Sequence, residues 1–334
     1  EVNGTKTYNV VDTCANDYEL KSEPMTQLEY DTLEQLGEVE SDKSYYIENG
    51  AIEKFTARWL RELPGCEYVF LQHGISYLSL SNEVAEWMAC RFNYINVASK
   101  RERDFLSSGF SLVPKESRAD FIIGGLPRWD LLKDTSNKEP EKIVFVMMTW
   151  RSTFNAGMDI LKKSAYYRGL KALLSKENIE MMRKMGLRVV WAPHHHMANR
   201  IKDLDFEFCE EVEVSDTTEI SKWIARSSIC ITDFSSVFGD FLFLGKPVVY
   251  WVPDRNDPLL DPKDGSAGAK VKSACENLEK WFNVAHSEAE VMEYVKHYKG
   301  NGFELEKDKL RLASTLFDCK DGICEKLFNG LKDI

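Results

Sequence analysis

The sequence lacks closely spaced cysteine pairs. Its eight cysteines are spread over 334 residues, and the closest two, Cys319 and Cys324, are five positions apart. Zinc sites usually contain cysteine pairs separated by only a few residues, so a zinc site is disfavoured. The cysteine content is also too low for a disulfide scaffold. We therefore expect reduced cysteines, with Cys230 in the core, and a cytoplasmic protein.

The sequence also lacks a GxGxxG fingerprint and a Walker motif, so dinucleotide cofactors and P-loop hydrolysis have no support. No apolar run approaches the ~20 residues that a transmembrane helix needs. The net charge of -11 disfavours nonspecific nucleic-acid binding through a basic surface. The chain begins with Glu1 rather than Met, from which we expect a cut or processed N-terminus.

What the sequence does contain is an alternation of apolar runs and amphipathic segments, and its apolar fraction of 43% suits a packed core. Strands are predicted at 67–74, 95–99, 120–132 (running into a Gly-Gly-x-Pro turn), 142–150, 187–196, 211–216, 228–234 and 246–252. Helices are predicted at 101–110, 159–185, 218–227, 235–245, 274–283, 287–298 and 305–331. Such alternation predicts parallel sheets with crossover connections.

The polar, proline-containing stretch 133–141 is the best candidate for a linker. We therefore predict an α/β protein with two Rossmann-like parallel-sheet domains, at 1–135 and 140–305, followed by closing C-terminal helices at 306–334. Ligands of such folds bind at the carboxyl ends of strands. The polar motifs described next all follow predicted strands.

The segment TDFSS (232–236) lies where a strand ends and a helix begins. The first N–H groups of a helix lack partners and bind anions, and the hydroxyls of Ser235 and Ser236 can donate to the same phosphate. The alternative is an ordinary helix N-cap. Arg151 follows the strand at 142–150, where its guanidinium can clamp a phosphate or pair with an acidic side chain on the surface.

Histidines follow two other strands. Adjacent imidazoles on a strand cannot all point at one metal ion, so His194 or His195 is assigned a phosphate contact or protonation of a leaving group. His73 precedes Gly74, where it can act as a base toward an acceptor hydroxyl or serve as a structural histidine.

Two further segments are interpreted structurally. Arg128 and Asp130 of GLPRWD are expected to form a local ion pair that fixes the region between the domains. The acidic stretch 254–265 lacks the EF-hand spacing, and we expect a mobile loop at the mouth of the cleft rather than a calcium site.

Several segments in their order resemble the CDP-glycerol glycerophosphotransferase family, which comprises teichoic acid polymerases and primases and their capsule relatives. The segments are FLQHGIS (70–76), GGLPRWDLL (124–132), VFVMMTWRS (144–152), WAPHH (191–195), residues 219–251 and residues 312–331. The resemblance implies a GT-B-like fold, with the acceptor bound by the N-terminal domain and a CDP-polyol donor by the C-terminal domain. It also implies a phosphotransferase that releases CMP and needs no metal or other cofactor.

The resemblance assigns catalytic roles to four residues. His73 matches the general base of the family's HG motif, and Arg151 matches a pyrophosphate contact. His194 aligns with the family's second essential histidine, where His195 stands in place of the usual proline, so the choice between the two stays open. We predict that His73→Ala and Arg151→Ala each abolish most turnover and leave the fold intact.

The resemblance also implies a donor phosphate site. Thr232, Ser235 and Ser236 match hydroxyls that contact the donor phosphates, and Asp233 is expected to brace their loop. The donor is CDP-glycerol or CDP-ribitol, which the sequence does not distinguish. The acceptor is expected to be a polyol-phosphate chain or a lipid-linked saccharide of a teichoic-acid-like or capsular polymer. This implies a cytoplasmic enzyme that is peripheral at the inner face of the cell membrane.

Three other functions compete with this interpretation. A GT-B glycosyltransferase that uses a nucleotide sugar in cell-surface polysaccharide synthesis would share the architecture. A nucleotide-sugar epimerase would release no CMP. A non-enzymatic module of polymer assembly would have no need for the histidines, the arginine and the serine pair together.

Overall fold

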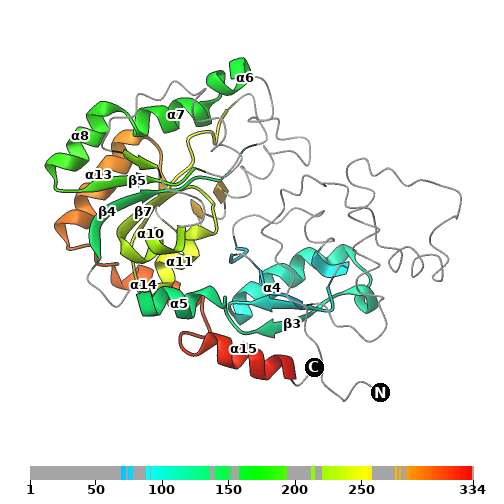
Figure 1. The fold of residues 1–334 in the computed structure, drawn as a ribbon. Coiled ribbons are helices and arrows are strands. Elements are labelled where there is room, and N and C mark those ends of the chain that lie inside the picture. The colour runs from blue at the N-terminus through cyan, green and yellow to red at the C-terminus, as the bar shows by residue number, and fades with distance from the viewer. Residues whose placement is uncertain are drawn as a thin grey trace, which may run out of the picture.

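The computed structural model describes residues 69–72, 74–77, 88–90, 92–135, 140–149, 151, 158–193, 212–214, 220–257, 275–276, 278–279, 282 and 284–332. These residues form two parallel β-sheets with helices packed around them (Figure 1). The three-stranded sheet precedes the predicted linker and, with its helices, is called the first unit. The six-stranded sheet follows the linker and, with its helices, is called the second unit. The predicted α/β class with two parallel-sheet units is confirmed.

The first sheet has three strands in the order β1-β2-β3, namely Val69–Phe70, Tyr94–Val97 and Asp120–Ile123. Helix α4 (Lys100–Gly109) and two 3-10 turns, η1 (Phe110–Leu112) and η2 (Lys115–Ser117), connect β2 to β3. The apolar runs that predicted these strands supply the core between the sheet and α4, which includes Phe70, Ile95, Val97, Leu106 and Phe110.

The second sheet has six parallel strands in the order β6-β5-β4-β7-β8-β9. In chain order they are β4 (Glu141–Val146), β5 (Arg188–Trp191), β6 (Val212–Val214), β7 (Ser227–Thr232), β8 (Val248–Trp251) and β9 (Val284–Ala285). The chain first moves outward from β4 through β5 to β6 and then restarts at β7 on the other side. This is the Rossmann strand order, and its switch point lies between β4 and β7.

Both faces of the second sheet are buried, as parallel sheets require. Along β4, Ile143 and Phe145 point into one core cluster and Val144 and Val146 into another, the period of two expected of a strand. One face is covered by α7 (Ala165–Leu173), α8 (Lys176–Lys184) and α13 (Glu288–Gly300), and the other by α10 (Ile220–Arg226), α11 (Val237–Phe243) and α14 (Lys307–Ser314). Cys230 is fully buried in this core, as predicted.

Three predicted elements are wrong in detail. The helix predicted at 305–331 is two helices, α14 (Lys307–Ser314) and α15 (Ile323–Lys332). The single helix predicted at 159–185 is three helices, α6 (Met158–Lys163), α7 and α8. Ser164 and Ser175 break it, because each side chain accepts a bond from a backbone N–H and so begins a new helix. The end of the predicted strand 120–132 is instead helix α5 (Arg128–Thr135), which overlaps the predicted linker.

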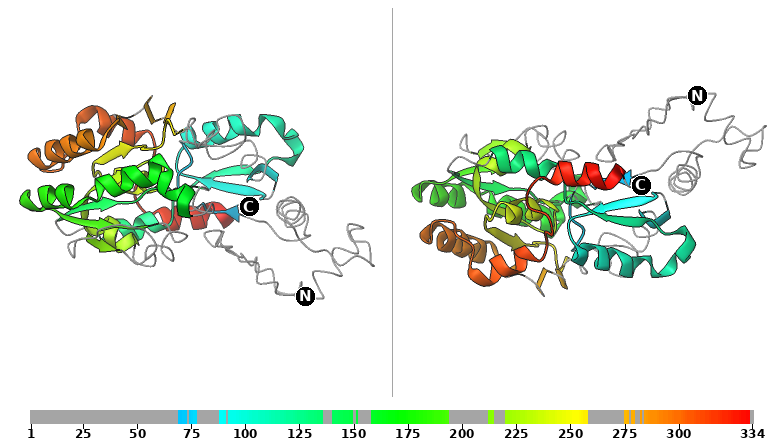
Figure 2. Two further views of the ribbon diagram at one scale, coloured as in Figure 1. Left: turned by 90° about the horizontal axis from the view of Figure 1, so that it is seen from above. Right: turned by 90° about the horizontal axis from the view of Figure 1, so that it is seen from below.

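The C-terminal helix α15 (Ile323–Lys332) lies beside the first sheet, which both views of Figure 2 show. It contacts β3 and α5, although α14 before it packs on the second sheet. Gly125 has a φ of 82°, and a side chain there would meet Ile323 at 3.3 Å. The chain therefore crosses between the two units a second time at its end.

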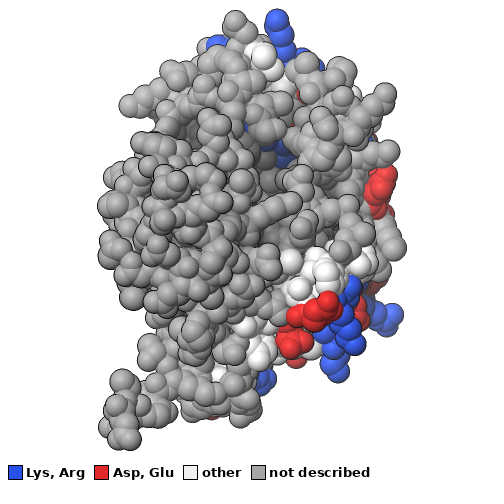
Figure 3. All heavy atoms as spheres, turned by 90° about the vertical axis from the view of Figure 1, so that its right-hand side faces the viewer, with Lys and Arg blue, Asp and Glu red and all other residues white. Residues whose placement is uncertain are grey.

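The described surface carries mixed charge. Figure 3 shows one face on which Lys and Arg side chains lie beside Asp and Glu side chains. On α4, for example, Arg103 forms an exposed ion pair with Asp104. None of the described helices has both the length and the hydrophobicity required to span a bilayer.

Candidate functional site

The candidate site is built at the switch point of the second sheet. The loop after β4 contains Thr149 and Arg151, and the loop after β7 contains Asp233 to Ser236. Because β4 and β7 are adjacent and parallel, these loops leave the same edge of the sheet. That edge is where ligands of open α/β sheets bind.

Asp233 joins the two loops. Its carboxylate is fully buried and accepts bonds from the backbone N–H of Thr149 at 2.9 Å, the Thr149 hydroxyl at 2.8 Å and the N–H of Ser235 at 3.1 Å. It also pairs with Nη1 of Arg151 at 2.8 Å. This one side chain therefore fixes the distance between the ends of β4 and β7.

Arg151 is buried rather than on the surface, with a side chain that is 2% exposed. Its Nε and Nη2 donate to Asp254 at 2.7 and 3.0 Å, and Nη1 donates to the carbonyl of Thr149 at 2.8 Å. The guanidinium lies over the rings of Tyr166 and Phe234, at 4.7 and 4.4 Å from their centroids.

The positive charge of Arg151 is therefore balanced by the two buried carboxylates of Asp233 and Asp254. Burial alone would lower its pKa, but the carboxylates of Asp254 and Asp233 raise the pKa overall. Four of the five N–H groups of Arg151 are engaged with Asp254, Asp233 and Thr149, so a donor phosphate can reach only the remaining N–H of Nη2 unless one of these partners is exchanged. Removing the guanidinium would also leave two buried carboxylates without their cation. The prediction that Arg151→Ala leaves the fold intact therefore needs correction, and we expect a loss of stability as well.

The serines of the β7 loop are placed differently from Thr232. Thr232 ends β7 fully buried, and its hydroxyl donates to the carbonyl of Met147 at 2.5 Å, which ties β7 to the end of β4. Ser236 stands at the N-cap of α11 but makes no side-chain cap bond. Serines cap α4, α7, α8 and α13 through such bonds. The sequence alternative, an ordinary side-chain N-cap by Ser or Asp, is therefore absent at Ser236, whereas Asp233 accepts a bond from the backbone N–H of Ser235.

The first unit reaches this site through the loop after β1. A Cβ atom at Gly74 would lie 2.2 Å from Oγ of Ser236, and one at Gly239 would lie 2.6 Å from Ile75. The loop therefore packs directly on the start of α11. His73, His194 and His195 lie outside the described residues. Gly74, the residue that follows His73 in the sequence, packs against Ser236 of the second unit.

The expected local ion pair between Arg128 and Asp130 is wrong. Arg128 instead pairs bidentately with Asp240 of α11, at 2.8 and 2.9 Å from Nη2, and Trp129 donates to the same carboxylate at 2.7 Å. Asp130 accepts bonds from the backbone N–H groups of Ile323 and Cys324 at the start of α15. The two side chains thus hold α5 to two different helices, one of them on the second unit.

The acidic stretch that begins at Asp254 is also different from the expected mobile loop. Asp254 is 1% exposed and holds Arg151, and Asp257 is buried and accepts a bond from the N–H of Ala165 at 2.5 Å, where α7 begins. The start of the stretch is therefore fixed in the interior. Residues 258–265 lie outside the described residues.

Two buried acids escaped the sequence interpretation. Asp240 lies in an apolar helix segment, and nothing nearby in the sequence indicates its partner Arg128. Glu102 is fully buried in α4. The pattern Ser99-x-x-Glu102 is a helix capping box and could have drawn attention to it.

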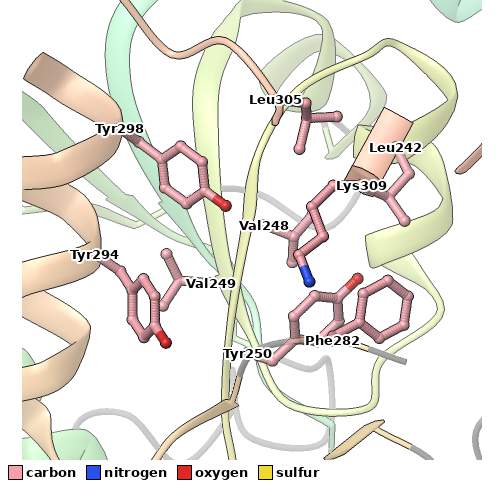
Figure 4. A pocket seen from close by; sticks show the side chains of 9 residues that line it. All are labelled: Leu242, Val248, Val249, Tyr250, Phe282, Tyr294, Tyr298, Leu305 and Lys309. Carbon is pink, nitrogen blue, oxygen red and sulfur yellow. The ribbon is translucent and has the colours of Figure 1, made fainter. Parts of the chain in front are cut away.

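One small pocket lies away from this site (Figure 4). It is enclosed by Leu242, Val248, Val249, Tyr250, Phe282, Tyr294, Tyr298, Leu305 and Lys309. The Tyr250 hydroxyl is buried without a hydrogen-bond partner, and the pocket has room for little more than a water molecule. It contains none of the predicted site residues and is too small for a nucleotide. Among the described residues, no group of three or more His, Cys, Asp or Glu side chains is placed to hold a metal.

Comparison with known proteins gives consistent relatives. A family model described as CDP-Glycerol:Poly(glycerophosphate) glycerophosphotransferase matches residues 3–259. The chain is 30% identical over 215 residues to the minor teichoic acid biosynthesis protein GgaB of Bacillus subtilis (strain 168). It is 26% identical over 230 residues to the teichoic acid poly(glycerol phosphate) polymerase of Bacillus spizizenii. Each match covers 59% of this chain, but only 22% of the first relative and 54% of the second.

The fold has a solved counterpart in the wall teichoic acid polymerase TagF. The TM-score is 0.58 at 17% identity, and the match covers 82% of this chain and 70% of that chain. At this identity the likeness supports the architecture, and the chemistry has to be argued from the site.

Proposed function

The chain belongs to the CDP-glycerol:poly(glycerophosphate) glycerophosphotransferase family, and we propose that it transfers a polyol phosphate from a CDP-polyol to a hydroxyl of a growing polymer. The acceptor oxygen attacks the phosphorus that bears the polyol. The bond from this phosphorus to the oxygen of the CMP phosphate breaks, and CMP leaves with the electron pair. The acceptor proton passes to a base.

The observation that carries this proposal is the meeting of three loops. Arg151 follows β4, Ser235 and Ser236 follow β7, and Gly74 of the first unit packs against Ser236. The first two loops meet at the switch point of the Rossmann-ordered sheet, the usual nucleotide position of such folds. A donor bound there would have its phosphates between the serine hydroxyls of the second unit and the HG segment of the first.

The role proposed for each side chain follows from the hydrogen bonds that it already makes within the protein. Ser236 has a hydroxyl that is not used as a helix cap, so it can donate to a donor phosphate. Asp233 and Thr232 are committed to fixing the ends of β4 and β7. We assign them to shaping the site, and Arg151 to the positive field near the pyrophosphate. His73 is the proposed base, and His194 or His195 the group that assists the leaving phosphate.

The finer features are proposals as well. Phosphoryl transfer depends mainly on positioning and on positive donors around the phosphate oxygens. We propose that protein groups supply that field without a metal ion, and that the donor is CDP-glycerol or CDP-ribitol. The acceptor is a polyol-phosphate polymer or a lipid-linked saccharide, met at the inner face of the membrane.

The test is CMP release from CDP-glycerol and CDP-ribitol, compared with UDP- and GDP-sugars, with a teichoic-acid-like oligomer as acceptor and EDTA present. Release of CMP with one CDP-polyol, unaffected by EDTA, is expected. If the protein turns over a nucleotide sugar and has no activity with either CDP-polyol, the proposal is rejected in favour of a glycosyltransferase.

A matched pair of variants ties the activity to this site. Ser236→Ala should lower kcat by roughly 10²–10³, the usual cost of removing one donor to developing charge. Ser314→Ala, an exposed serine on α14, should leave kcat unchanged. Equal activity of the two variants would argue against a donor phosphate at Ser236.

A further inference from the structure

Glu102 is a fully buried carboxyl group on the first turn of α4 that the proposed chemistry does not use. Ser99 caps α4 and accepts a bond from the N–H of Glu102 at 3.2 Å, as in a capping box. In such a box the glutamate reaches back to the N-cap residue. Here one carboxyl oxygen accepts from the N–H of Ala98, one residue earlier, at 2.7 Å.

The other carboxyl oxygen leaves the helix and holds the loop after β1. It accepts from the N–H of Ser76 at 2.6 Å, and Nε2 of Gln72 lies at 3.5 Å. Gln72 has a φ of 61°, a strained value for a residue with a side chain. It is fixed there because its side chain also donates to the carbonyl of Asn96 at 2.7 Å and accepts from the Ser76 hydroxyl at 3.1 Å.

The loop that Glu102 holds contains the contact with the second unit. Gly74 lies between the two anchored residues Gln72 and Ser76, and it packs against Ser236. The carboxyl group is therefore connected through two residues of one loop to the serine of the proposed donor site.

We propose that Glu102 is a positioning residue for the transfer reaction, fixing the Gln72–Tyr77 loop so that its contact with the donor site is set before substrate binds. The inference rests on the proposed function for what the loop does, but not for which residue fixes it. A carboxyl group suits the task because its two oxygens accept from two backbone N–H groups at once. An amide has only one oxygen and would present an NH₂ group to the second N–H.

Burial supports the same assignment. Desolvation raises the pKa of Glu102 to about 7, against the lowering effect of the bonds from Ala98, Ser76 and Gln72. Such a group is costly to keep in the interior. Its burial beside the loop is therefore better explained by the two backbone bonds than by packing alone.

The experiment compares Glu102→Gln and Glu102→Ala with Asp104→Asn, an exposed acid on the same helix. Hydrogen exchange of the peptide covering residues 72–77 reports on the loop, and exchange in α7 reports on the rest of the fold. Steady-state kinetics gives kcat and the donor KM. We expect faster exchange in the loop, a fall in kcat of about 10²-fold for Glu102→Ala, a smaller fall for Glu102→Gln, and little change in donor KM. The control should match the wild type.

The outcomes separate the possible failures. Unchanged exchange at 72–77 in both Glu102 variants would overturn the proposal, and so would faster exchange with an unchanged kcat. If α7 also exchanges faster and activity falls only because the whole protein unfolds, then Glu102 contributes to stability alone and does not position the loop. If the wild type turns over neither CDP-polyol, the proposed function fails. The exchange comparison would still accept or reject Glu102 as the residue that fixes the loop.

Discussion

Gly74 and Ser236 lie so close together that a β-carbon on Gly74 would sit 2.2 Å from the Ser236 hydroxyl oxygen. They lie in loops that follow strands of different sheets, and this contact is one of the places where the two units meet. No side chain fits at position 74 unless Ser236 moves. The requirement for glycine in the HG segment therefore comes from the approach of the second unit.

Gly74→Ala should displace Ser236 and lower kcat by about 10²-fold, the scale of loss from a misplacement near 1 Å. Gly300→Ala is the control, since a β-carbon at that helical position meets nothing within 4 Å. CMP release and thermal unfolding should be measured for both. Wild-type turnover in Gly74→Ala would show that the two units do not need this contact.

The double variant Gly74→Ala/Ser236→Gly separates packing from chemistry. Without the Ser236 side chain, the nearest atom to the new β-carbon is the Cα at 3.7 Å, an ordinary van der Waals contact. Thermal stability should return toward that of Ser236→Gly alone, and activity should stay low because the hydroxyl is absent. Recovery of activity would mean that Ser236 matters for packing and not for the donor.

Arg151 bridges the buried carboxylates of Asp233 and Asp254. Arg151→Met should lower the free energy of unfolding by about 3–5 kcal/mol, because it leaves two buried acids without their cation. Arg151→Met/Asp254→Asn should recover part of that loss. Urea unfolding of the single and double variants measures both effects. A single variant as stable as the wild type would show that the carboxylates find other partners or take up protons.

Activity of the same variants should be measured at a temperature at which each is folded. Turnover that returns with stability in the double variant would assign Arg151 to supporting the loops. Turnover that stays low would favour a direct part for its charge in catalysis.

Asp130 accepts bonds from the first two N–H groups of α15, although it lies 193 positions before Ile323. Asp130→Ala should destabilise the docking of α15 by about 0.5–2 kcal/mol, the usual cost of losing a helix cap. Faster hydrogen exchange in residues 323–332 would report this. Asp134→Ala, at an exposed position on the same helix α5, is the control. Equal exchange in the two variants would contradict the capping role.

These pairs show where sequence interpretation succeeds and where it stops. Continuous apolar runs predicted β4, β7 and β8, because a strand of a doubly covered parallel sheet must be apolar on both faces. The order of motifs at strand ends predicted which loops meet. The strand predictions and the predicted meeting of loops both depend on local sequence patterns that recur along the chain.

Ion pairs and hydrogen bonds between residues far apart in the sequence could not be predicted from these local patterns. Arg128 and Asp130 look like a local pair, but their partners lie far along the chain, at Asp240 and at the start of α15. Asp254 was grouped with its acidic neighbours, whereas the structure pairs it with Arg151. Which oppositely charged groups meet is decided by the order of strands and by helix packing. A single sequence does not encode those in its local pattern.

The buried carboxyl of Glu102 gives a prediction about pH. Its pKa is raised to about 7 in the folded protein, chiefly by burial, from an ordinary value of 4.5. The folded state therefore holds this proton more tightly than the unfolded state does. The stabilising contribution is fully present below the unfolded pKa of about 4.5 and is lost as pH rises through about 7.

The glutamine of Glu102→Gln cannot ionise. Comparing the stability of this variant with that of the wild type therefore isolates the pH dependence that comes from Glu102 from that of every other titrating group. Near pH 4.5 the folded protein holds Glu102 in its neutral form, and the stability difference is then most favourable to the wild type. Between about pH 4.5 and 7 the wild type should lose stability relative to the variant by up to a few kcal/mol, given roughly 1.4 kcal/mol for each pKa unit. Above about pH 7 the difference should level off, since the group is then ionised in both states. Urea unfolding of both proteins across this range measures the difference. If it does not change with pH, then Glu102 titrates alike in the folded and unfolded chains, and the interior around the Gln72–Tyr77 loop admits water.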